Sequence, residues 1–561
     1  MSESEERTRT AGTEVHSRQG GTPGKERRCQ PEKRMPKVSP PTDSSEQDAW
    51  AEKSPTPGEV EARLRATFEA VIAFAKRPAP AGKTLYDFEL ALRPLVFVLG
   101  RLLLALFLCR QHEGLAVPQE AREAGRRFRR KQPQGRELGT FFGKVRYWRT
   151  YMHAPGGGFY PLDRLLKIPA DGCSFGLVSL MTRLATKVSY AQARLLLQCC
   201  IGWSPSTTSV ERAVLGLGRR TQAWFEAAPA PEGDGEVLVI MADCKASPTA
   251  TEAELRKRRG KRRKKKRAAS PRHRGRQRRK GRTKKPRRKK GDHSKNGRAA
   301  TLLVMYTLKV GTHEGKRVLK GPINRRLYGS YGKQRHAFAI ARREADRRGF
   351  TRESGKVVQI VMDGANSLSD YARELFPEAI FTLDVIHATE YVWKAGRSFF
   401  REGSKDLERW VASQRERLYD GDARGVVADL EKGLARIPKT GPGNKGKRER
   451  LEAAIRYLSK RVAMMNYKEL IAQDLEISSG PIEGAVRYVI GQRFDSAGMR
   501  WIRERAEALL QLRCIELNGH WDEFLEFVEG TAAAATEPIR LQAASPAPLP
   551  TFGTEPLAQA S

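Results

Sequence analysis

The sequence predicts an α/β protein with a layered central domain, and three observations lead to this prediction. Four nearly continuous apolar runs indicate strands that are buried on both faces. A helical pattern lies between the third and fourth runs, and a long helical stretch follows the fourth, from Ala388 to Ala472. The runs are Val237 to Asp243 (VLVIMAD), Thr301 to Val310 (TLLVMYTLKV), Val357 to Asp363 (VVQIVMD) and Ile380 to Asp384 (IFTLD).

The length and the less patterned segments predict how the chain is divided. A chain of 561 residues exceeds one ordinary domain, so we expect several folded units. Residues 1–56 and 530–561 have compositions typical of disordered tails. The most apolar run, Pro94 to Cys109, is interrupted by Gly100 and Arg101, so we expect a buried helix there and no membrane span. The polar N-terminus and the seven scattered cysteines, without a CxxC pair, favour a cytoplasmic, nucleoid-associated protein with reduced thiols.

The region before the predicted sheet is expected to be a helical part, residues 57–135, followed by a mixed part, residues 136–230. An alternating pattern before Gly156-Gly157-Gly158 predicts a small β-ribbon and a turn in the mixed part. Apolar residues at helical spacing predict helices over Glu59–Lys76, Tyr86–Glu113, Phe175–Lys187, Tyr190–Ile201 and Ser206–Leu217.

The last two of these helices flank Gly202-Trp203-Ser204-Pro205 and are similar to a helix-turn-helix. Thr208 and Glu211 stand at capping-box spacing at the start of the second helix. In a DNA-binding unit, this helix would turn four polar side chains toward a groove: Ser206, Thr207, Ser209 and Arg212. The alternative is an ordinary helical hairpin that is packed for stability.

The charge of the chain favours a polyanionic partner. The net charge is +40, and Arg256 to Lys290 holds 24 Lys or Arg in 35 residues without an acid. Without those 24 cations the net charge falls from +40 to +16, so the remaining chain is also basic. Phosphate contacts dominate nucleic-acid affinity, and we therefore expect nucleic acid as the partner. For the basic block alone, a solubilising or disordered loop is an equal alternative.

Two of the predicted strands end in an aspartate, Asp243 and Asp363. A carboxylate at the carboxyl end of a buried strand faces the crevice where open α/β sheets bind ligands. Two such acids can hold divalent metals for phosphodiester cleavage, and oxygen ligands suit Mg²⁺. The alternative is that each aspartate only caps a turn or helix. A third acid would come from a later helix, and spacing leaves Glu390, Glu476 and Glu483 open.

Three segments give the chain a family resemblance. They are VMDGANSLSDYARELFPEAIFTLDVIHATEYVW, ISSGPIEGAVRYVIGQRFDSAGMRW and LRCIELNGHWDEF. With them the chain resembles bacterial insertion-sequence transposases of the DDE class, ISKra type, related to Mutator-like transposases. The resemblance covers roughly Thr140 to Phe527. It implies an RNase H-like catalytic core over about residues 235–520, with a helical insertion at about 388–475.

The resemblance also implies the roles of individual residues. The second catalytic acid of the family falls on Asp363 and the third, in a Ser-Gly-x-x-Glu-Gly element, on Glu483. The first falls on Asp243, although the family usually has glycine where this chain has Cys244. All three would hold the metal. Asp384 and His387 form an aspartate-x-x-histidine element that is expected to position DNA or the metal site.

Several cationic and aromatic residues near these elements are candidates for contacts with DNA. Arginine suits bidentate phosphate contacts, and tryptophan can stack on an unpaired base. The alternatives are a solvated basic face and core aromatic residues. The candidates are Arg487, Arg493, Arg500, Trp501 and Trp393.

We therefore expect a transposase that cleaves element ends and transfers the strand into target DNA, using Mg²⁺ with Mn²⁺ as an alternative. Its partners would be double-stranded DNA, both terminal repeats and target, and a homodimer or higher oligomer would form on that DNA. The alternatives are a catalytically inactive, transposase-derived DNA-binding protein and an RNA-associated basic protein. The sequence contains no GxSxG, HExxH or P-loop motif and no RNA-module signature.

Overall fold

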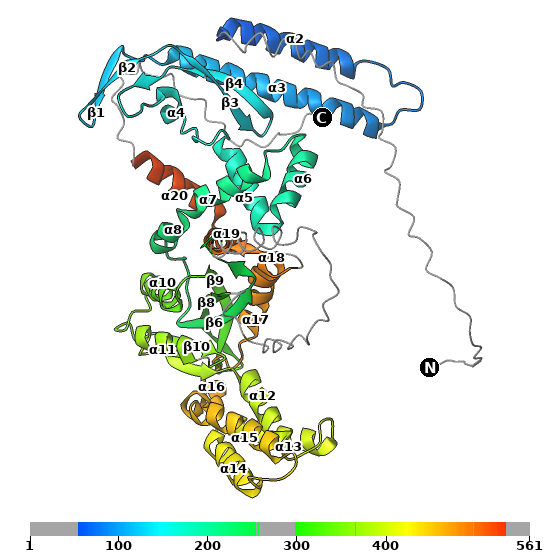
Figure 1. Cartoon of the computed structure of the whole chain (residues 1–561), viewed down its shortest axis with the longest axis vertical. Helices are drawn as coiled ribbons and strands as arrows, with labels where there is room; N and C mark the ends of the chain where they lie inside the picture. Colours follow the sequence, from blue (N-terminus) through cyan, green and yellow to red (C-terminus); the bar gives the residue numbers. More distant parts are fainter. Residues whose placement is uncertain are drawn as a thin grey trace, which may run out of the picture.

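The computed structural model describes residues 54–250, 252–253, 256, 298–364, 366–496 and 499–534. The described chain is elongated (Figure 1). A helical hairpin and β-ribbons lie at one end, a helical layer and a β-sheet follow, and a helical bundle forms the other end. The predicted α/β class is confirmed. The basic block beyond Arg256 and most of both predicted tails lie outside the described residues.

The central sheet has five strands in the order β11-β10-β6-β8-β9. β6 runs parallel to β10, and β10 runs parallel to β11, whereas β6, β8 and β9 are antiparallel neighbours. All four predicted strands are present; the fifth, β9, was not predicted because its sequence is polar and its outer half is exposed. The strands are β6 (Val237–Ser247), β8 (Arg298–His313), β9 (Lys316–Ser330), β10 (Val357–Met362) and β11 (Ile380–Leu383).

A single hydrophobic cluster joins the sheet to helices that come before and after it in the chain. It runs from Leu177 and Val214 through Ile240 and Ile360 to Leu430 in the bundle. The helical part of the predicted 136–230 region therefore shares its core with the 235–520 region. The helices that contribute buried residues to this cluster around the sheet are α5 (Phe175–Lys187), α7 (Thr207–Gly218), α8 (Thr221–Ala227), α10 (Gln334–Arg347), α11 (Asn366–Leu375), α19 (Arg503–Leu517) and α20 (Trp521–Ala534).

The bundle at the far end comes from the long helical stretch that the sequence predicts (Figure 1). It packs at the end of the sheet where β10 and β11 finish, which places it next to the candidate site. Its helices are α12 (Val385–Gly396), α13 (Lys405–Tyr419), α14 (Ala423–Arg436), α15 (Asn444–Ser459) and α16 (Tyr467–Ala472).

The N-terminal part is less helical than expected. The helical hairpin α2 (Pro57–Ala75) and α3 (Leu85–Gly114) is present, but two strands also fall within the expected helical region 57–135. β1 (Glu120–Glu123) and β2 (Arg126–Arg130) form a ribbon that β5 (Met152–His153) extends. The predicted β-ribbon is confirmed as β3 (Gln134–Thr140) paired with β4 (Gly143–Arg149), followed by the short helix α4 (Pro161–Leu165).

The expectation of a buried helix at Pro94 to Cys109 is wrong. α3 is one continuous helix that packs on α2 and β4, yet only 17% of its most apolar 18-residue window is buried. By length and composition it is the one helix among the described residues that could cross a membrane. Arg101, which interrupts the apolar run, donates a hydrogen bond to Phe142 O at 2.9 Å. Long-range contacts of that kind cannot be read from the run itself.

The helix-turn-helix candidate consists of α6 (Tyr190–Ile201) and α7, with Gly202 in a left-handed conformation between them. Ser206, not Thr208, caps α7 by accepting a hydrogen bond from Ser209 N, so the predicted capping box is wrong. One face of α7 packs against α5 and α19. Arg212 and the cap region are exposed, which leaves the outer face of α7 open to solvent.

Candidate active site

Three aspartates lie in one row across the parallel part of the sheet. Met362 of β10 is paired with Ala242 of β6 and with Leu383 of β11. Met362 is followed by Asp363, Ala242 by Asp243 and Leu383 by Asp384. Asp384 N donates to Met362 O at 3.0 Å, which keeps the third aspartate in register with the second. The strand register therefore brings together acids that are separated by up to 141 positions in the sequence.

Asp243 does not end its strand, contrary to the prediction. β6 continues to Ser247 because its antiparallel neighbour β8 continues to pair with it after the parallel neighbour β10 has ended. Asp363 follows β10 directly, as predicted. Cys244 points to the opposite side of β6 from Asp243, because successive side chains of a strand alternate. Its thiol contacts Thr301 Oγ1 at 3.5 Å, and burial raises the pKa of the thiol.

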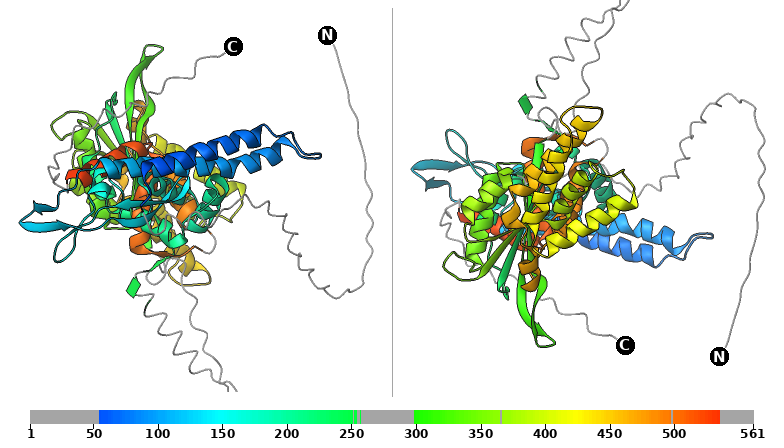
Figure 2. Two further views of the ribbon diagram at one scale, coloured as in Figure 1. Left: turned by 90° about the horizontal axis from the view of Figure 1, so that it is seen from above. Right: turned by 90° about the horizontal axis from the view of Figure 1, so that it is seen from below.

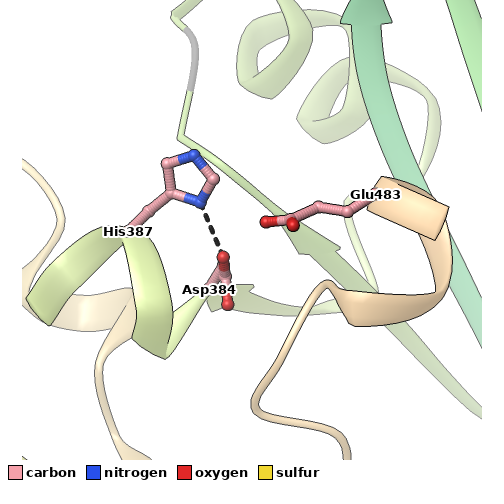
Figure 3. A group of neighbouring side chains, drawn as sticks. All are labelled: Asp384, His387 and Glu483. Carbon is pink, nitrogen blue, oxygen red and sulfur yellow. Dashed lines mark hydrogen bonds and ion pairs between the residues drawn. The ribbon is translucent and has the colours of Figure 1, made fainter. Parts of the chain in front are cut away.

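The third acid is brought to the row by a short helix, α17 (Gly480–Ala485), which packs on β6 and β8. Figure 3 shows the Glu483 carboxylate turned toward Asp384 and His387, and ligand atoms of these three residues lie within 4.8 Å of one another. Burial raises the pKa of Asp243, and the carboxylates of Asp363 and Glu483 raise it further, against a hydrogen bond from Cys244 N. Asp243 thus lies close enough to Asp363 and Glu483 for their charges to raise its pKa, and we call these three acids one electrostatic group.

The other two candidates for the third acid are placed elsewhere. Glu390 is exposed on α12 and pairs with Lys394 at 3.5 Å. Glu476 accepts a hydrogen bond from Tyr306 Oη at 2.9 Å. Of the three glutamates that spacing leaves open, the structure brings Glu483 to the aspartates.

The Asp384 carboxylate is fully buried and accepts three hydrogen bonds. Ile386 N at 3.1 Å and Ser479 N at 3.2 Å donate to Oδ1, and His387 Nδ1 lies 2.6 Å from Oδ2. Burial alone would raise the pKa of Asp384, but these hydrogen bonds outweigh it and hold the pKa below its ordinary value. Asp384 therefore caps α12, orients the imidazole and holds the segment that leads into α17.

His387 is held by its Nδ1 atom, as Figure 3 shows. The hydrogen bond to Asp384 raises the pKa of His387, burial opposes this, and the charges of Asp384 and Asp363 add to the increase. Within the described residues, Nε2 makes no hydrogen bond; with Nδ1 donating to Asp384, this atom accepts when the ring is neutral and donates when the ring is the imidazolium that the raised pKa favours. The predicted pairing of Asp384 with His387 is thus a physical contact that orients the ring.

Two donor sets at this site could hold a metal ion. The first is Asp384, His387 and Glu483, whose ligand atoms are mutually close. Both carboxylate oxygens of Asp384, however, already accept hydrogen bonds, and one of them engages the imidazole. The second set, Asp243, Asp363 and Glu483, offers only oxygen ligands; burial raises the pKa of Asp243, and the charges of Asp363 and Glu483 add to that increase. By the chemistry of its oxygens the second set suits Mg²⁺, whereas within the described residues it is the first set whose ligand atoms lie within 4.8 Å of one another.

The turn after β10 is held by two residues of the helical bundle that no sequence motif predicts. Tyr457 Oη donates to the main-chain carbonyl of Asp363, and Arg461 donates to that of Gly364, from Nε at 2.9 Å and also from the terminal nitrogen. Gly364 has φ of +74°, and a Cβ there would collide with the Arg461 side chain. These contacts span more than 90 residues, so no local pattern could have predicted them.

The segment that follows Glu483 is a π-helix, η2 (Val486–Gly491). Two main-chain carbonyls of this π-helix accept hydrogen bonds from the buried Arg513 of α19: Tyr488 O at 2.6 Å and Val489 O at 3.0 Å. Arg513 also donates to Thr186 O at the end of α5. A buried guanidinium thus connects the helical layer to the segment that carries Glu483. Single-turn π-helices are rare and often lie at functional sites.

The predicted DNA-contacting residues fall into two groups. Arg212, Arg487 and Arg500 are exposed and remain available for phosphate. Arg493 is 2% exposed, donates to Ala185 O at 2.9 Å and lies 4.7 Å from the Trp501 ring, so the prediction that it contacts DNA is wrong. Burial lowers the pKa of Arg493 to about 10, and its guanidinium has a structural role between α5 and α18 (Gln492–Phe494).

The two tryptophans also pack against the core. Trp501, in the short strand β12 (Trp501–Ile502), lies 5.1 Å from the Phe494 ring and donates to Phe494 O at 3.2 Å. Trp393 is partly buried against the main cluster. Both are positioned as packing residues, which was the alternative to stacking on DNA bases.

Comparison with known proteins identified no relative of the chain. No model of a known protein family matches the chain, and no curated protein matches it.

Proposed function

We propose that this protein is a DDE-type DNA transposase that cleaves the ends of its element and transfers the strand into target DNA. The proposal includes an RNase H-like core, and the strand arrangement supports it: three antiparallel strands followed by two parallel ones in a single mixed sheet. The helical bundle between β11 and α17 corresponds to the expected insertion before the third acid.

One observation carries the proposal. The strand register sets Asp243 and Asp363 side by side, and α17 brings Glu483 to the same place. The three residues that the family resemblance selects thus converge from positions 120 residues apart. An unrelated set of caps and turns has no reason to converge on one electrostatic group.

The roles follow from the placement of the groups. Asp243, Asp363 and Glu483 would hold Mg²⁺, which, when bound, activates the attacking hydroxyl and stabilises the leaving oxygen in phosphodiester cleavage. Asp384 holds His387 through Nδ1, so that Nε2 of the protonated ring can donate to a phosphate oxygen. Tyr457 and Arg461 hold the Asp363 turn in place through its main chain. The exposed arginines, Arg212, Arg487 and Arg500, are available to bind the DNA backbone.

The test replaces one acid and measures DNA cleavage. The Asp363→Asn variant and the unmodified chain are incubated with Mg²⁺ and a plasmid that carries the coding sequence with its native flanking DNA. We expect the variant to bind this DNA and to produce no ends. Asp370→Asn is the matched control, because Asp370 is an exposed aspartate on α11, and it should cleave normally.

Cleavage by Asp363→Asn at the unmodified rate would exclude the assignment. Binding without cleavage by the unmodified chain would favour the alternative, a transposase-derived DNA-binding protein that no longer cuts. Sedimentation of the DNA complex would test the proposed dimer or higher oligomer, since two element ends must be joined.

A further inference from the structure

The outer part of the β8–β9 hairpin, residues 309–320, extends beyond the end of β6, whose pairing with β8 stops at Leu308. Figure 2 shows this green hairpin projecting from the body of the molecule. We call residues 309–320 the cationic ribbon. It carries four cations, Lys309, Lys316, Arg317 and Lys320, and one acid, Glu314, in its turn. No residue of the cationic ribbon lies in the candidate active site.

The strand register gathers the lysines on one side of the cationic ribbon. Lys309 is paired with Lys320, and His313 is paired with Lys316. Because side chains alternate along a strand, these four residues share one face with Gly311. The stem of Lys320 passes over Gly311, where a Cβ would approach its Cε to 3.1 Å. All four side chains are exposed, so the face is positively charged and open to solvent.

The protein neutralises this cationic face only in part: the charge of Lys309 acts on the Glu236 carboxylate, whose pKa is lowered mainly by the hydrogen bond from Val310 N. Lys309, Lys316 and Lys320 form no ion pair with any carboxylate of the described residues. Two like charges directly across an antiparallel pair destabilise it, so the Lys309–Lys320 pair weakens its own ribbon. A bound polyanion would remove this repulsion, which gives the unpaired lysines a function that stability alone does not.

The opposite side and the edge of the cationic ribbon are held by the rest of the chain. Leu319 N donates to Asp474 Oδ2 at 2.6 Å, Val310 N donates to Glu236 Oε2 at 2.6 Å, and Leu319 packs against the main cluster. The ribbon is therefore anchored near the loop that follows α16, and its lysine face remains exposed. A two-stranded ribbon of this kind fits the major groove of duplex DNA.

We infer that the cationic ribbon is a binding surface for duplex DNA, with the Lys309, Lys316 and Lys320 ammonium groups on backbone phosphates. The inference rests on the proposed function only in its choice of DNA as the polyanion. The contact is to phosphate, so it adds affinity and orientation without reading the sequence.

The test uses the full chain in EDTA, so that binding is measured without cleavage. Binding of a 30-base-pair duplex of arbitrary sequence is followed by fluorescence anisotropy over a range of salt concentrations. The variant combines Lys309→Gln, Lys316→Gln and Lys320→Gln. We expect the slope of log affinity against log salt to fall by roughly 2 to 3, and the affinity at moderate salt to fall on the order of tenfold.

The control variant combines Lys405→Gln, Arg424→Gln and Lys439→Gln, three exposed cations of the bundle that likewise form no ion pair within the described residues. It removes the same charge and should leave the slope nearly unchanged. An equal change in both variants, or an unchanged slope in the ribbon variant, would overturn the inference. Weaker binding to duplex RNA or to polyglutamate, with duplex DNA binding intact, would also overturn it.

A melting experiment separates binding from folding. Removal of the Lys309–Lys320 repulsion should leave the melting temperature unchanged or raise it. If the triple variant melts lower, the single Lys316→Gln variant at the tip of the ribbon decides the question, with an expected slope change of about 1. Because no step requires a metal, failure of the cleavage test and failure of this inference are distinguishable.

Discussion

The hydroxyl of Tyr457 donates a hydrogen bond to the main-chain carbonyl of Asp363, and the two residues are 94 positions apart. Tyr457 lies on α15, within the inserted bundle, whereas Asp363 directly follows a strand of the central sheet. The bundle therefore contacts the candidate catalytic acid through the main chain of Asp363. Burial raises the pKa of Tyr457, so its hydroxyl stays a proton donor at neutral pH.

The first prediction concerns this contact. Tyr457→Phe keeps the ring stacked on Tyr391 at 3.6 Å but removes the hydrogen bond. We expect a loss of about 1 kcal/mol in unfolding free energy and a higher Mg²⁺ requirement for cleavage, because the Asp363 turn is less well held. Urea unfolding and a Mg²⁺ titration measure the two effects. Tyr391→Phe removes the hydroxyl of the stacked partner and is the control; the same change in its Mg²⁺ requirement would contradict the prediction.

The second prediction compares two glycines that both have positive φ. Gly364 has φ of +74° with Arg461 and Leu383 close to the position of a Cβ, whereas Gly355 has φ of +68° with nothing within 4 Å. Gly355→Ala should cost about 1 to 2 kcal/mol for the left-handed backbone. Gly364→Ala should cost about 1 to 3 kcal/mol more through overpacking, and should abolish cleavage. Thermal unfolding of both variants is the measurement, and equal losses would show that Arg461 moves aside freely.

The third prediction concerns the buried guanidinium that holds the π-helix. Arg513→Lys keeps the charge but cannot reach Tyr488 O, Val489 O and Thr186 O together. We expect a loss of about 2 to 4 kcal/mol in unfolding free energy, together with slower cleavage, because the segment after Glu483 loosens. The control is Arg456→Lys on the exposed side of α15, which should change stability by less than about 0.5 kcal/mol. Full stability of Arg513→Lys would exclude a structural role for this contact.

The fourth prediction is a dependence of stability on pH. The Asp234 carboxylate accepts hydrogen bonds from the fully buried Arg348 at 2.6 and 2.8 Å, and from Asn324 and Thr307. Burial alone would raise the pKa of Asp234, but these partners outweigh it and hold the pKa below 3.8. The unfolded chain therefore binds this proton more readily, so the stabilisation is present above about pH 4 and is lost as the pH falls through the folded pKa.

Asp234→Asn should remove this acid-dependent part of the stability and leave the Arg348 charge buried without a carboxylate. We expect a loss of about 3 to 5 kcal/mol at neutral pH. Urea unfolding of both proteins between pH 3 and pH 7 is the measurement. Parallel stability curves for the two proteins over that range would show that Asp234 does not contribute to the pH dependence.

Much of the fold could be predicted from local pattern, because burial imposes that pattern on each element. The run VLVIMA identifies β6 since both faces of that strand are covered, and the helical period from Ala388 to Ala472 identifies the bundle. β9 carries no such pattern, because its outer half is exposed and polar. The prediction of a buried helix at α3 was wrong, because an apolar run looks the same whether it is buried by the rest of the chain or left largely exposed.

In the candidate site, too, some residues could be predicted from local sequence and others could not. Asp363 after a strand and the pairing of Asp384 with His387 follow from short motifs, because neighbours in sequence are neighbours in space. Arg493 was misjudged, because an arginine inside a basic chain gives no local sign that its guanidinium is buried against a tryptophan. The roles of Tyr457, Arg461 and Arg513 were invisible in the sequence for the same reason: each acts on a carbonyl far away in the chain.

The sequence by itself determined the α/β class, the positions of four strands and the identity of the acids that could carry chemistry. Only the tertiary structure decided that Glu483, and not Glu390 or Glu476, joins the aspartates, and that three lysines of β8 and β9 form one unpaired face. The physical reason is the range of the forces involved. Backbone preference and hydrophobic period act over a few residues, whereas strand register and helix packing set distances between residues that the chain separates by a hundred positions or more.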